Sequence, residues 1–335
     1  MVDLIGIEQL ARKLRHIDDD IVAQAAAQNE WFTESNIRRA VKSVADEFLC
    51  VEKLSQWLAR YDGLPVAEPA KVMVVTAGNI PMVGFFDLFC AMLAGHRVVL
   101  KPSSRDRVLM CYAADLLNKY LGAKIEVVDA IDNDADALLF MGSDSTAEML
   151  LRDWADKPHI IRSHRISVAL LSGNESDEQL ERLADDVFAY FGLGCRNVTN
   201  IFLPQDFDEE RLIEVFNRYN IASEEYRSVV RRQKARLAVC CQPFVAGDFF
   251  LFKDGFSTDT QMGEVRLCRY QDENELQLLL NQNEEYIQCV VSENVKLSDW
   301  KVVDFGQAQK PALDDFPDRC DTMIFLQKIV TFAET

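Results

Sequence analysis

Two residues of this sequence have neighbours that suit nucleophilic attack on a carbonyl group. Cys195 follows Gly192 and Gly194, and these small residues let a substrate carbonyl approach the thiol closely. Asn79 lies much earlier in the chain, in the turn that follows the apolar residues 71–76. A backbone N–H and an asparagine amide can together hold the oxyanion that forms when a thiol attacks. The pair therefore predicts an enzyme with a covalent intermediate at the thioester level.

The elements around Asn79 predict a parallel sheet that positions it. Residues 71–76 are rich in Val and Met and predict a buried strand, and the apolar helix that follows ends at Gly95. The next elements are expected as a strand, a helix and two further strands at residues 97–100, 108–120, 124–128 and 137–140. Strands and helices that alternate at this spacing predict a doubly wound α/β sheet with right-handed crossovers. Ligands bind such a sheet at the carboxyl ends of its strands, where Asn79 would lie.

The elements around Cys195 predict a second α/β lobe. A buried strand at residues 166–171 leads into an amphipathic helix, and this helix delivers Cys195. Further strands of this lobe are expected at residues 200–203, 236–241, 264–270 and 287–291. The last apolar run, residues 322–326, is also expected to be a strand.

The chain is long enough for two domains with a cleft between them. Helical periodicity before the first strand predicts a helical N-terminal cap. We expect this cap and a dinucleotide-binding domain at residues 1–171, followed at residues 172–299 by a catalytic domain that carries the nucleophilic cysteine. Residues 300–335 are expected as a C-terminal segment that returns to the cofactor domain or to a partner subunit.

The composition excludes several classes of partner. The chain has 335 residues, with 54 Asp and Glu against 36 Lys and Arg, and a net charge of −18. Nucleic acids and anionic membranes attract clustered basic residues, so we expect neither as a partner. The nine cysteines and four histidines show no spacing typical of metal ligands, so no metal site is expected. The scattered cysteines, and the lack of a signal segment or membrane-spanning run, predict a cytoplasmic protein without membrane insertion.

Six landmarks of the sequence occur in the order that is typical of one enzyme superfamily. They are Ala77-Gly78-Asn79-Ile80-Pro81, Leu100-Lys101-Pro102-Ser103-Ser104, Phe140-Met141-Gly142-Ser143, Ser172-Gly173-Asn174, Gly194-Cys195-Arg196 and Gly263-Glu264-Val265. From about Lys71 onward the sequence resembles the aldehyde dehydrogenase superfamily, and within it the LuxC-like acyl-CoA reductases, which make aldehydes from activated fatty acids. The resemblance implies an aldehyde-dehydrogenase-like α/β fold, with a Rossmann-type doubly wound cofactor domain and a second α/β catalytic domain.

The resemblance assigns catalytic roles to two residues. Cys195 would be the nucleophile that accepts the acyl group of a thioester, and fatty acyl-CoA is the expected donor. The side chain of Asn79 and the N–H of Cys195 would form the oxyanion hole. A nicotinamide cofactor would then reduce the acyl-cysteine to an aldehyde. The ordinary alternatives are a small buried side chain for Cys195 and a turn residue for Asn79.

One departure from the superfamily bears on the reaction. Relatives that hydrolyse the thioester carry a glutamate in a Glu-Leu-Gly-Gly motif, and the matching residues here are Leu170-Leu171-Ser172-Gly173. General-base help to water is typically worth about 10²–10⁴ in rate, so without it the acyl-cysteine persists and can be reduced by hydride. Glu175 could replace the missing base only if its loop folds back.

The resemblance also assigns cofactor contacts after the second strand. Lys101 and Ser103 match a Lys-Pro-Ser motif whose lysine reaches the adenine ribose of a nicotinamide dinucleotide. Many NAD-preferring relatives have a glutamate directly after this serine, where it binds the ribose hydroxyls, and Ser104 stands at that position here. The missing carboxylate removes repulsion against a 2′-phosphate, and Arg105 or Arg107 could pair with that phosphate. The sequence therefore favours NADPH over NADH.

Two further cofactor contacts follow from the resemblance. Gly142 and Ser143 open a helix whose free N–H groups and dipole suit a pyrophosphate. Ala147 stands in this helix where the family often has a second glycine. Glu264 matches the acidic residue that holds the nicotinamide ribose.

Three alternative functions stay open at this point. The same fold could run oxidatively, as an NAD(P)-dependent aldehyde dehydrogenase that makes an acid. The chain could be the acyl-carrying subunit of a fatty acid reductase complex, with an acyl-protein synthetase as its partner. It could also be a structural relative with an inactive site, although Asn79, Lys101 and Cys195 are all present. The family's usual exchange of C-terminal strands implies a homodimer.

Overall fold

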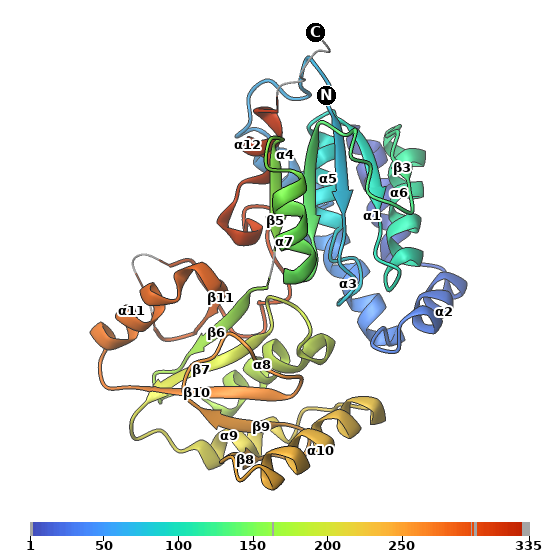
Figure 1. Cartoon of the computed structure of the whole chain (residues 1–335). Helices are drawn as coiled ribbons and strands as arrows, with labels where there is room; N and C mark the ends of the chain where they lie inside the picture. Colours follow the sequence, from blue (N-terminus) through green and yellow to red (C-terminus); the bar gives the residue numbers. More distant parts are fainter. Residues whose placement is uncertain (1–2, 163, 296, 298–299, 330–335) are drawn as a thin grey trace. The chain divides into compact units, whose positions relative to one another are not determined.

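The chain forms two compact units, each with a sheet of its own (Figure 1). The computed structural model describes residues 3–162, 164–295, 297 and 300–329. The first unit contains the described residues up to His164 and those from Pro311 onward, and the second contains Arg165–Lys310. Two α/β sheets and a helical N-terminal region are the architecture that the sequence predicts.

Four helices precede the first strand. They are α1 (Leu4–Arg15), α2 (Asp19–Gln28), α3 (Glu34–Glu47) and α4 (Val51–Leu58). Asp3 begins α1 by accepting hydrogen bonds from the N–H groups of Ile5 and Gly6, and Thr33 begins α3 by accepting one from Asn36. Each helix buries an apolar face in the main core of the first unit, so the predicted cap is an integral part of that unit.

The first sheet has the strand order β3-β2-β1-β4-β5, and all of its neighbouring strands are parallel. Its strands are β1 (Lys71–Val75), β2 (Arg97–Lys101), β3 (Glu126–Val127), β4 (Ala137–Met141) and β5 (His159–Arg162). The chain moves outward from β1 to β3 and then returns to the other side of β1 for β4. Such a switch point opens a crevice at the carboxyl ends of the strands, where ligands bind.

Helices cover both faces of this sheet. They are α5 (Phe85–Leu93), α6 (Arg107–Leu121) and α7 (Asp144–Asp153). Side chains alternate along β1, so Val72 and Val74 join the core that contains α5 and α6, whereas Met73 and Val75 join the core beneath α7. Because both faces are covered, β1, β2 and β4 contain continuous apolar runs, which explains why the sequence shows them clearly. The sequence does not predict β5, which has four residues with a charged residue at its end.

The C-terminal residues of the first unit form a helix, so the strand expected at residues 322–326 is wrong. Helix α12 (Thr322–Gln327) begins at Asp321, whose carboxylate accepts the N–H groups of Met323 and Ile324. A short apolar run suits either element, and the capping carboxylate favours the helix here. Residues 322–326 therefore do not provide the C-terminal strand whose exchange would form a homodimer.

Arg162 holds this C-terminal segment to the first sheet. Its guanidinium lies at the end of β5 and forms a bidentate ion pair with Asp87 of α5, with both N–O distances 3.0 Å. The same guanidinium donates to the carbonyl of Pro317 at 2.7 Å and to Oγ1 of Thr322 at 2.8 Å. Both charged side chains are almost fully buried, so the pair anchors the segment at a point that water does not reach.

The second sheet has the order β12-β11-β6-β7-β10-β9-β8, parallel except for the pair β8 and β9. Its strands are β6 (Ile166–Leu170), β7 (Val198–Pro204), β8 (Val245–Ala246), β9 (Leu251–Asp254), β10 (Glu264–Tyr270), β11 (Ile287–Val291) and β12 (Val302–Val303). Because β6 pairs with β7 and β11, the division expected at residue 171 is corrected to His164. Because β12 pairs with β11, the division expected at residue 299 is corrected to Lys310. The apolar character of a strand shows that it is buried, but not which sheet it joins.

The helices of the second unit are α8 (Asp177–Phe188), α9 (Glu209–Phe216), α10 (Glu224–Val239) and α11 (Glu273–Gln282). The strand expected at residues 236–241 is wrong, because most of this run forms the end of α10. Ser223 begins α10 by accepting the N–H of Tyr226, and the helix then continues for four turns. The apolar residues at its end are too few to show a period of their own.

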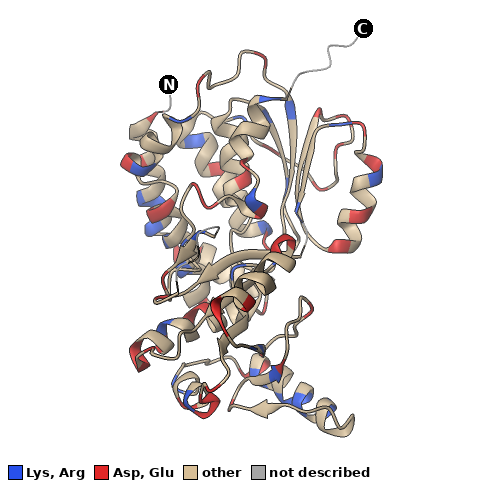
Figure 2. Cartoon of the chain, turned by 90° about the vertical axis from the view of Figure 1, so that its left-hand side faces the viewer, with Lys and Arg blue, Asp and Glu red and all other residues tan. Residues whose placement is uncertain are grey.

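Acidic residues are distributed over the elements of both units (Figure 2). This distribution agrees with the net charge of −18. Among the described residues there is no cluster of three or more potential metal ligands. No helix in the described part of the chain is long and apolar enough to cross a membrane.

Candidate active site

Cys195 lies on a tight turn between α8 and β7. After α8 ends at Phe188, the buried residues Tyr190 and Phe191 both adopt left-handed backbone angles, with φ of 51° and 61°. Such angles are strained for side chains of this size, so the surrounding contacts must hold them. The chain then turns back at Gly194, whose carbonyl accepts the N–H of Asn197 at 3.0 Å. Cys195 lies inside this turn and is partly exposed.

Two buried polar side chains contact the backbone of this turn. Oδ1 of Asn197 accepts the N–H of Gly194 at 2.8 Å, and its Nδ2 lies 2.8 Å from the carbonyl of Ala189. The hydroxyl of Ser167, on β6, donates to the carbonyl of Cys195 at 2.8 Å. Neither residue is singled out by the sequence alone. Asn197 has a weak local signal, since asparagine and glycine are both common in turns, whereas Ser167 has none.

Arg196, the residue after Cys195, contacts residues of β11 and of the segment that follows β12. Its Nε donates to the carbonyl of Ala308, and its Nη2 lies 3.4 Å from Sγ of Cys289 on β11. Asp186, at the end of α8, binds the same segment, since its carboxylate accepts the N–H groups of Gly306 and Ala308. The turn of Cys195 is therefore bound to both α8 and the segment that follows β12.

Asn79 lies in the first unit, in the loop between β1 and α5. The loop packs tightly against the one that follows β2, because a Cβ atom at Gly78 would lie 2.6 Å from Oγ of Ser103. Met82, with φ of 58°, donates its N–H to the buried carboxylate of Asp106 at 2.8 Å. Asn29 donates to the carbonyl of Gly78. The loop of Asn79 is thus fixed on both sides.

Asn79 and Cys195 belong to different units. The structure positions each of them within its own unit, on a loop that is anchored by buried polar contacts. Their meeting around one carbonyl group stays a prediction.

The predicted adenosine contacts lie at the end of β2. Lys101 is the last residue of this strand, beside Val75 of β1, and its side chain is partly exposed. Ser103 accepts the N–H of Arg105 at 3.2 Å, while Ser104 and Arg105 are exposed. Arg107 begins α6 and forms a 2.8 Å ion pair with the exposed Asp129. An exposed pair of this kind is worth little, so a phosphate can replace the carboxylate.

The predicted pyrophosphate contacts lie at the end of β4, on the other side of the switch point. Ser143 begins α7, and its hydroxyl lies 3.2 Å from Oγ of Ser145 and 3.1 Å from Oγ1 of Thr146. Three hydroxyls at a helix N-terminus are suitable donors for an anion. Gly142 lies against the ring of Phe140, where a Cβ atom would be only 2.4 Å away.

Ala147, which stands at the family's second glycine, is buried in the core beneath α7. Its methyl group therefore faces the sheet and does not cover the helix N-terminus. The residues at the ends of β2 and β4 fit a dinucleotide in their chemistry, and their contacts with one stay predictions.

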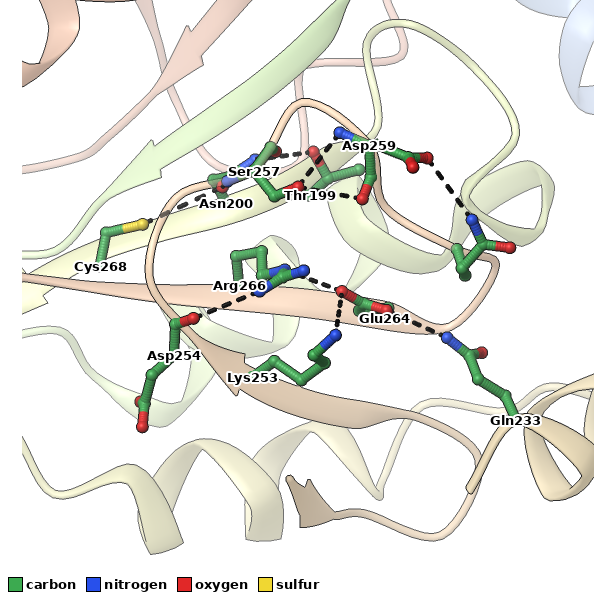
Figure 3. Close-up of polar contacts among 11 residues, drawn as sticks. Thr199, Asn200, Gln233, Lys253, Asp254, Ser257, Asp259, Glu264, Arg266 and Cys268 are labelled. Carbon is green, nitrogen blue, oxygen red and sulfur yellow. Dashed lines mark hydrogen bonds and ion pairs between the residues drawn. The ribbon is translucent and has the colours of Figure 1, made fainter. Parts of the chain in front are cut away.

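Glu264, the expected ribose ligand, is buried at the start of β10 (Figure 3). Its carboxylate forms ion pairs with Nε of Arg266 at 2.8 Å and Nζ of Lys253 at 3.5 Å, and Gln233 of α10 donates to it at 3.1 Å. These contacts already neutralise the charge inside the unit. A role as ribose ligand stays a prediction, and it requires at least one of these contacts to be exchanged.

Glu175 lies in the turn after β6, and its side chain folds back onto the backbone of that turn. The carboxylate is 1% exposed, and it accepts the N–H of Ser172 at 2.7 Å, the hydroxyl of Ser172 at 2.8 Å and the N–H of Gly173 at 3.0 Å. Leu170, which stands at the place of the family's glutamate, is fully buried. Glu175 therefore holds the backbone of its own turn, and its oxygens are not presented to a water molecule.

The comparison with solved structures shows the fold. Aldehyde dehydrogenase 21 from Physcomitrella patens, in complex with succinate, is similar with a TM-score of 0.68 over 97% of this chain and 83% of that one, at 12% identity. Aldehyde dehydrogenase C from Pseudomonas syringae, in complex with NAD+ and octanal, is similar with a TM-score of 0.61 over 81% of this chain and 67% of that one, at 16% identity. An NADP-dependent enzyme from E. coli has a TM-score of 0.62 over 88% of this chain and 73% of that one, also at 16% identity. The fold is that of the aldehyde dehydrogenases, as predicted.

The sequence comparisons identify the family. An aldehyde dehydrogenase from Craterostigma plantagineum is 29% identical over 136 residues, which are 37% of this chain and 28% of that protein. The match thus spans less than a third of the length of this curated relative. Residues 6–230, more than half of the chain, match the family described as acyl-CoA reductase (LuxC). The turn of Cys195, the loop of Asn79 and the ends of β2 and β4 all lie within this range, and the chain belongs to the LuxC acyl-CoA reductase family.

Proposed function

We propose that this chain reduces an acyl thioester, with fatty acyl-CoA as donor, to an aldehyde through an acyl-cysteine on Cys195, with NADPH as reductant. Membership of the LuxC family and the aldehyde dehydrogenase fold support the reaction class. The anchored turn of Cys195 and the anchored loop of Asn79 support the two catalytic roles.

The contacts of Glu175 are the observation that favours reduction of the acyl-cysteine over its hydrolysis. A general base must accept a proton from water, and the carboxylate of this buried residue already accepts four hydrogen bonds. Three of them come from the N–H groups and hydroxyl of its own turn and the fourth from the side chain of Asn294, so using it as a base would break the turn. An acyl-cysteine without a base for water survives long enough to be reduced.

The residues of the chain perform the acyl transfer. The thiolate of Cys195 attacks the thioester carbonyl, while the side-chain amide of Asn79 and the N–H of Cys195 hold the oxyanion. Collapse of the oxyanion expels the donor thiol, which takes a proton, and leaves the acyl group on Cys195. When bound, the reduced nicotinamide supplies a hydride to the acyl carbonyl. The same donors then hold the second oxyanion, and its collapse releases the aldehyde and the cysteine thiolate.

The end of β2 supports NADPH as the reductant. Ser104 introduces no carboxylate that would repel a 2′-phosphate, and Arg105 and Arg107 lie within the next three residues. Lys101, Ser103 and Ser143 would hold the rest of the dinucleotide. A guanidinium binds a phosphate through two parallel N–H donors, which gives the site a preference for the phosphorylated cofactor.

The intact mass of the protein tests the proposal. The chain is mixed with a long-chain acyl-CoA, with and without NADPH, beside a Cys195→Ala control. The expected result is a mass gain equal to the acyl group that requires Cys195 and disappears when NADPH is added. If no adduct forms at Cys195, the proposal is wrong.

The acyl-carrying subunit is a second candidate, and the enclosed carboxylate of Glu264 favours it. If the Glu264 carboxylate stays bound to Arg266, Lys253 and Gln233, it does not bind the nicotinamide ribose, and NADPH then binds weakly. The chain would then hold the acyl group on Cys195 until an acyl-protein synthetase or reductase partner acts on it. An adduct that persists after addition of NADPH would support this candidate against the reductase.

A further inference from the structure

We propose that Asn197 and Ser167 are positioning residues that set the direction of the Cys195 thiol and of its N–H group. The inference rests on the proposed role of Cys195 as nucleophile. It concerns how the second unit orients the peptide groups on the two sides of this cysteine.

Asn197 binds both polar groups of Gly194. Its backbone N–H donates to the carbonyl of Gly194 at 3.0 Å, and its side-chain Oδ1 accepts the N–H of Gly194 at 2.8 Å. In a planar trans peptide the carbonyl and the following N–H point in opposite directions. Because the carbonyl of Gly194 points into the turn toward Asn197, the N–H of Cys195 points out of the turn. An N–H that points out of the turn suits the proposed role of oxyanion donor.

The amide of Asn197 also ties the turn to the end of α8. Its Nδ2 is within 3.3 Å of the carbonyls of Asp186, Val187 and Ala189, and the side chain is fully buried. The first two carbonyls belong to the last turn of α8 and the third to the residue that follows it, where backbone acceptors have no partner within the helix itself. One buried amide therefore satisfies the helix end and fixes Gly194 relative to it.

Ser167 fixes the other side of Cys195. Its hydroxyl donates to the carbonyl of Cys195 at 2.8 Å, and the residue is fully buried in β6. It lies in the interior of the sheet, in register with Val198 of β7 and Cys289 of β11. A hydroxyl on a central strand has little freedom to move. The peptide groups before and after Cys195 are therefore oriented by two buried side chains, those of Asn197 and Ser167.

The consequence is preorganisation of the nucleophile. Attack on a carbonyl needs the thiol and the oxyanion donor in one defined geometry, and a shift of about 1 Å can cost about 10²-fold in rate. Alkylation by a small reagent needs only an accessible thiolate and no oxyanion donor. Loss of a positioning contact should therefore slow acyl transfer to Cys195 much more than it slows alkylation.

The first experiment compares Ser167→Ala with Ser292→Ala. Ser292 is a matched control, because it is a buried serine of the same sheet region whose hydroxyl donates to the carbonyl of Leu170 at 2.8 Å. Two rates are measured for each protein. The first is release of p-nitrophenol from p-nitrophenyl acetate, less the release from the same protein with Cys195→Ala. The second is alkylation by iodoacetamide, followed by the mass of the peptide that contains Cys195, because Cys240 and Cys241 are also exposed. S167A is expected to lower the first rate about tenfold or more and to change the second less than about twofold. Equal ester rates in S167A and S292A would overturn the role of Ser167.

The second experiment applies the same two rates to Asn197→Ala, with Asn200→Ala as its control. Both asparagines are fully buried, but Asn200 binds Ser257, away from the turn of Cys195. N197A is expected to lose more of the ester rate than S167A, since it frees Gly194 and the end of α8 together. An ester rate equal to that of N200A would overturn the role of Asn197. If N197A does not fold, the S167A comparison alone decides the proposal.

The ester assay requires neither an acyl-CoA nor NADPH, so it separates this inference from the proposed function. A wild-type chain with no release that depends on Cys195 would overturn both. Release from the ester without any adduct from acyl-CoA would overturn the thioester substrate and leave the positioning roles standing. Release that is the same in the wild type, S167A and N197A would overturn the positioning roles alone.

Discussion

Several buried carboxylates of this chain accept hydrogen bonds from backbone N–H groups. Glu175 accepts the N–H groups of Ser172 and Gly173, and Asp186 does the same for two residues after β12. A carboxylate whose oxygens accept backbone N–H groups is engaged in holding its turn. At the scale of single residues, such contacts indicate that Glu175 and Asp186 hold the backbone in place, and that neither takes part in the reaction.

Glu175→Gln tests this distinction directly. The amide keeps one acceptor and turns an NH₂ group toward a backbone N–H, so unfolding by urea should show a loss of about 1–3 kcal/mol. Hydrolysis of the acyl-enzyme, followed as release of free fatty acid without NADPH, should stay within about twofold of the wild type. Glu178→Gln, at an exposed position of α8, is the control for stability. A large fall in fatty acid release would identify Glu175 as a base.

The arginines after Ser104 should decide the choice of cofactor. Replacing Arg105 and Arg107 together by alanine should raise the dissociation constant of NADPH about tenfold or more, because hydrogen bonds from a charged donor to the 2′-phosphate are lost. The dissociation constant of NADH should not change. Fluorescence titration of both cofactors measures this, with Arg97→Ala, at the amino end of β2, as the control. An equal loss for the two cofactors would contradict the phosphate contact.

Local motifs indicate the two residues for which we propose catalytic roles. The residues that we propose to position them are found only through contacts between segments far apart in the sequence. Cys195 and Asn79 are visible because their flanking glycines and turns are contiguous in the sequence. Ser167 is one more serine in an apolar strand, and only the pairing of β6 beside the turn brings its hydroxyl to Cys195. The contacts of Glu264 come from α10 and β9, so its enclosure could not be predicted from its neighbours in the chain.

At the scale of elements, α12 depends on a neutral histidine. Nδ1 of His96 accepts the N–H of Ala70 at 3.1 Å, so Nε2 carries the proton and donates to the carbonyl of Leu326 at 3.0 Å. Burial lowers the pKa of His96 from its usual value. A proton on Nδ1 would break the contact with Ala70, and one side chain thus links β1 to the C-terminal helix.

The sign of the resulting pH dependence follows from proton linkage. The unfolded chain binds a proton at His96 near pH 6.5 and the folded chain only at lower pH, so stability falls as the pH drops below about 6.5. His96→Gln should remove part of this loss between pH 7.5 and 5.5, as measured by thermal unfolding. His16→Gln, at an exposed position, should keep the wild-type dependence. An unchanged pH dependence in H96Q would contradict the linkage.

The elements that the sequence predicts correctly are those with long, continuous signals. The strands of both sheets that carry the site are β-branched or apolar runs that end near a turn, and they are predicted nearly in full. The runs at residues 236–241 and 322–326 are short, and the hydrogen-bonding caps Ser223 and Asp321 favour helices there. A cap is a single polar residue, and its effect depends on the backbone around it.

At the scale of the whole molecule, the second unit is inserted into the first. The chain enters it after His164 and leaves it before Pro311, and the residues that follow return to the first unit. The sequence predicts two α/β regions and a C-terminal segment that returns to the cofactor domain or to a partner subunit. It does not predict the two boundaries at His164 and Lys310, because a boundary between two buried strands has no composition of its own. The contacts of Arg162 with Asp87 and the C-terminal segment close the first unit around the insertion point.

The borders of the two sheets have a further consequence. In the described part of the chain, β3 and β5 border the first sheet, and β8 and β12 border the second. β3, β8 and β12 have two residues each, and β5 has four. An exposed border strand is a template on which another molecule can add its own strand and start a fibril. Borders this short present few unpaired N–H and C=O groups in a row. The chain is therefore protected against edge-to-edge aggregation by its strand lengths, independently of its charge.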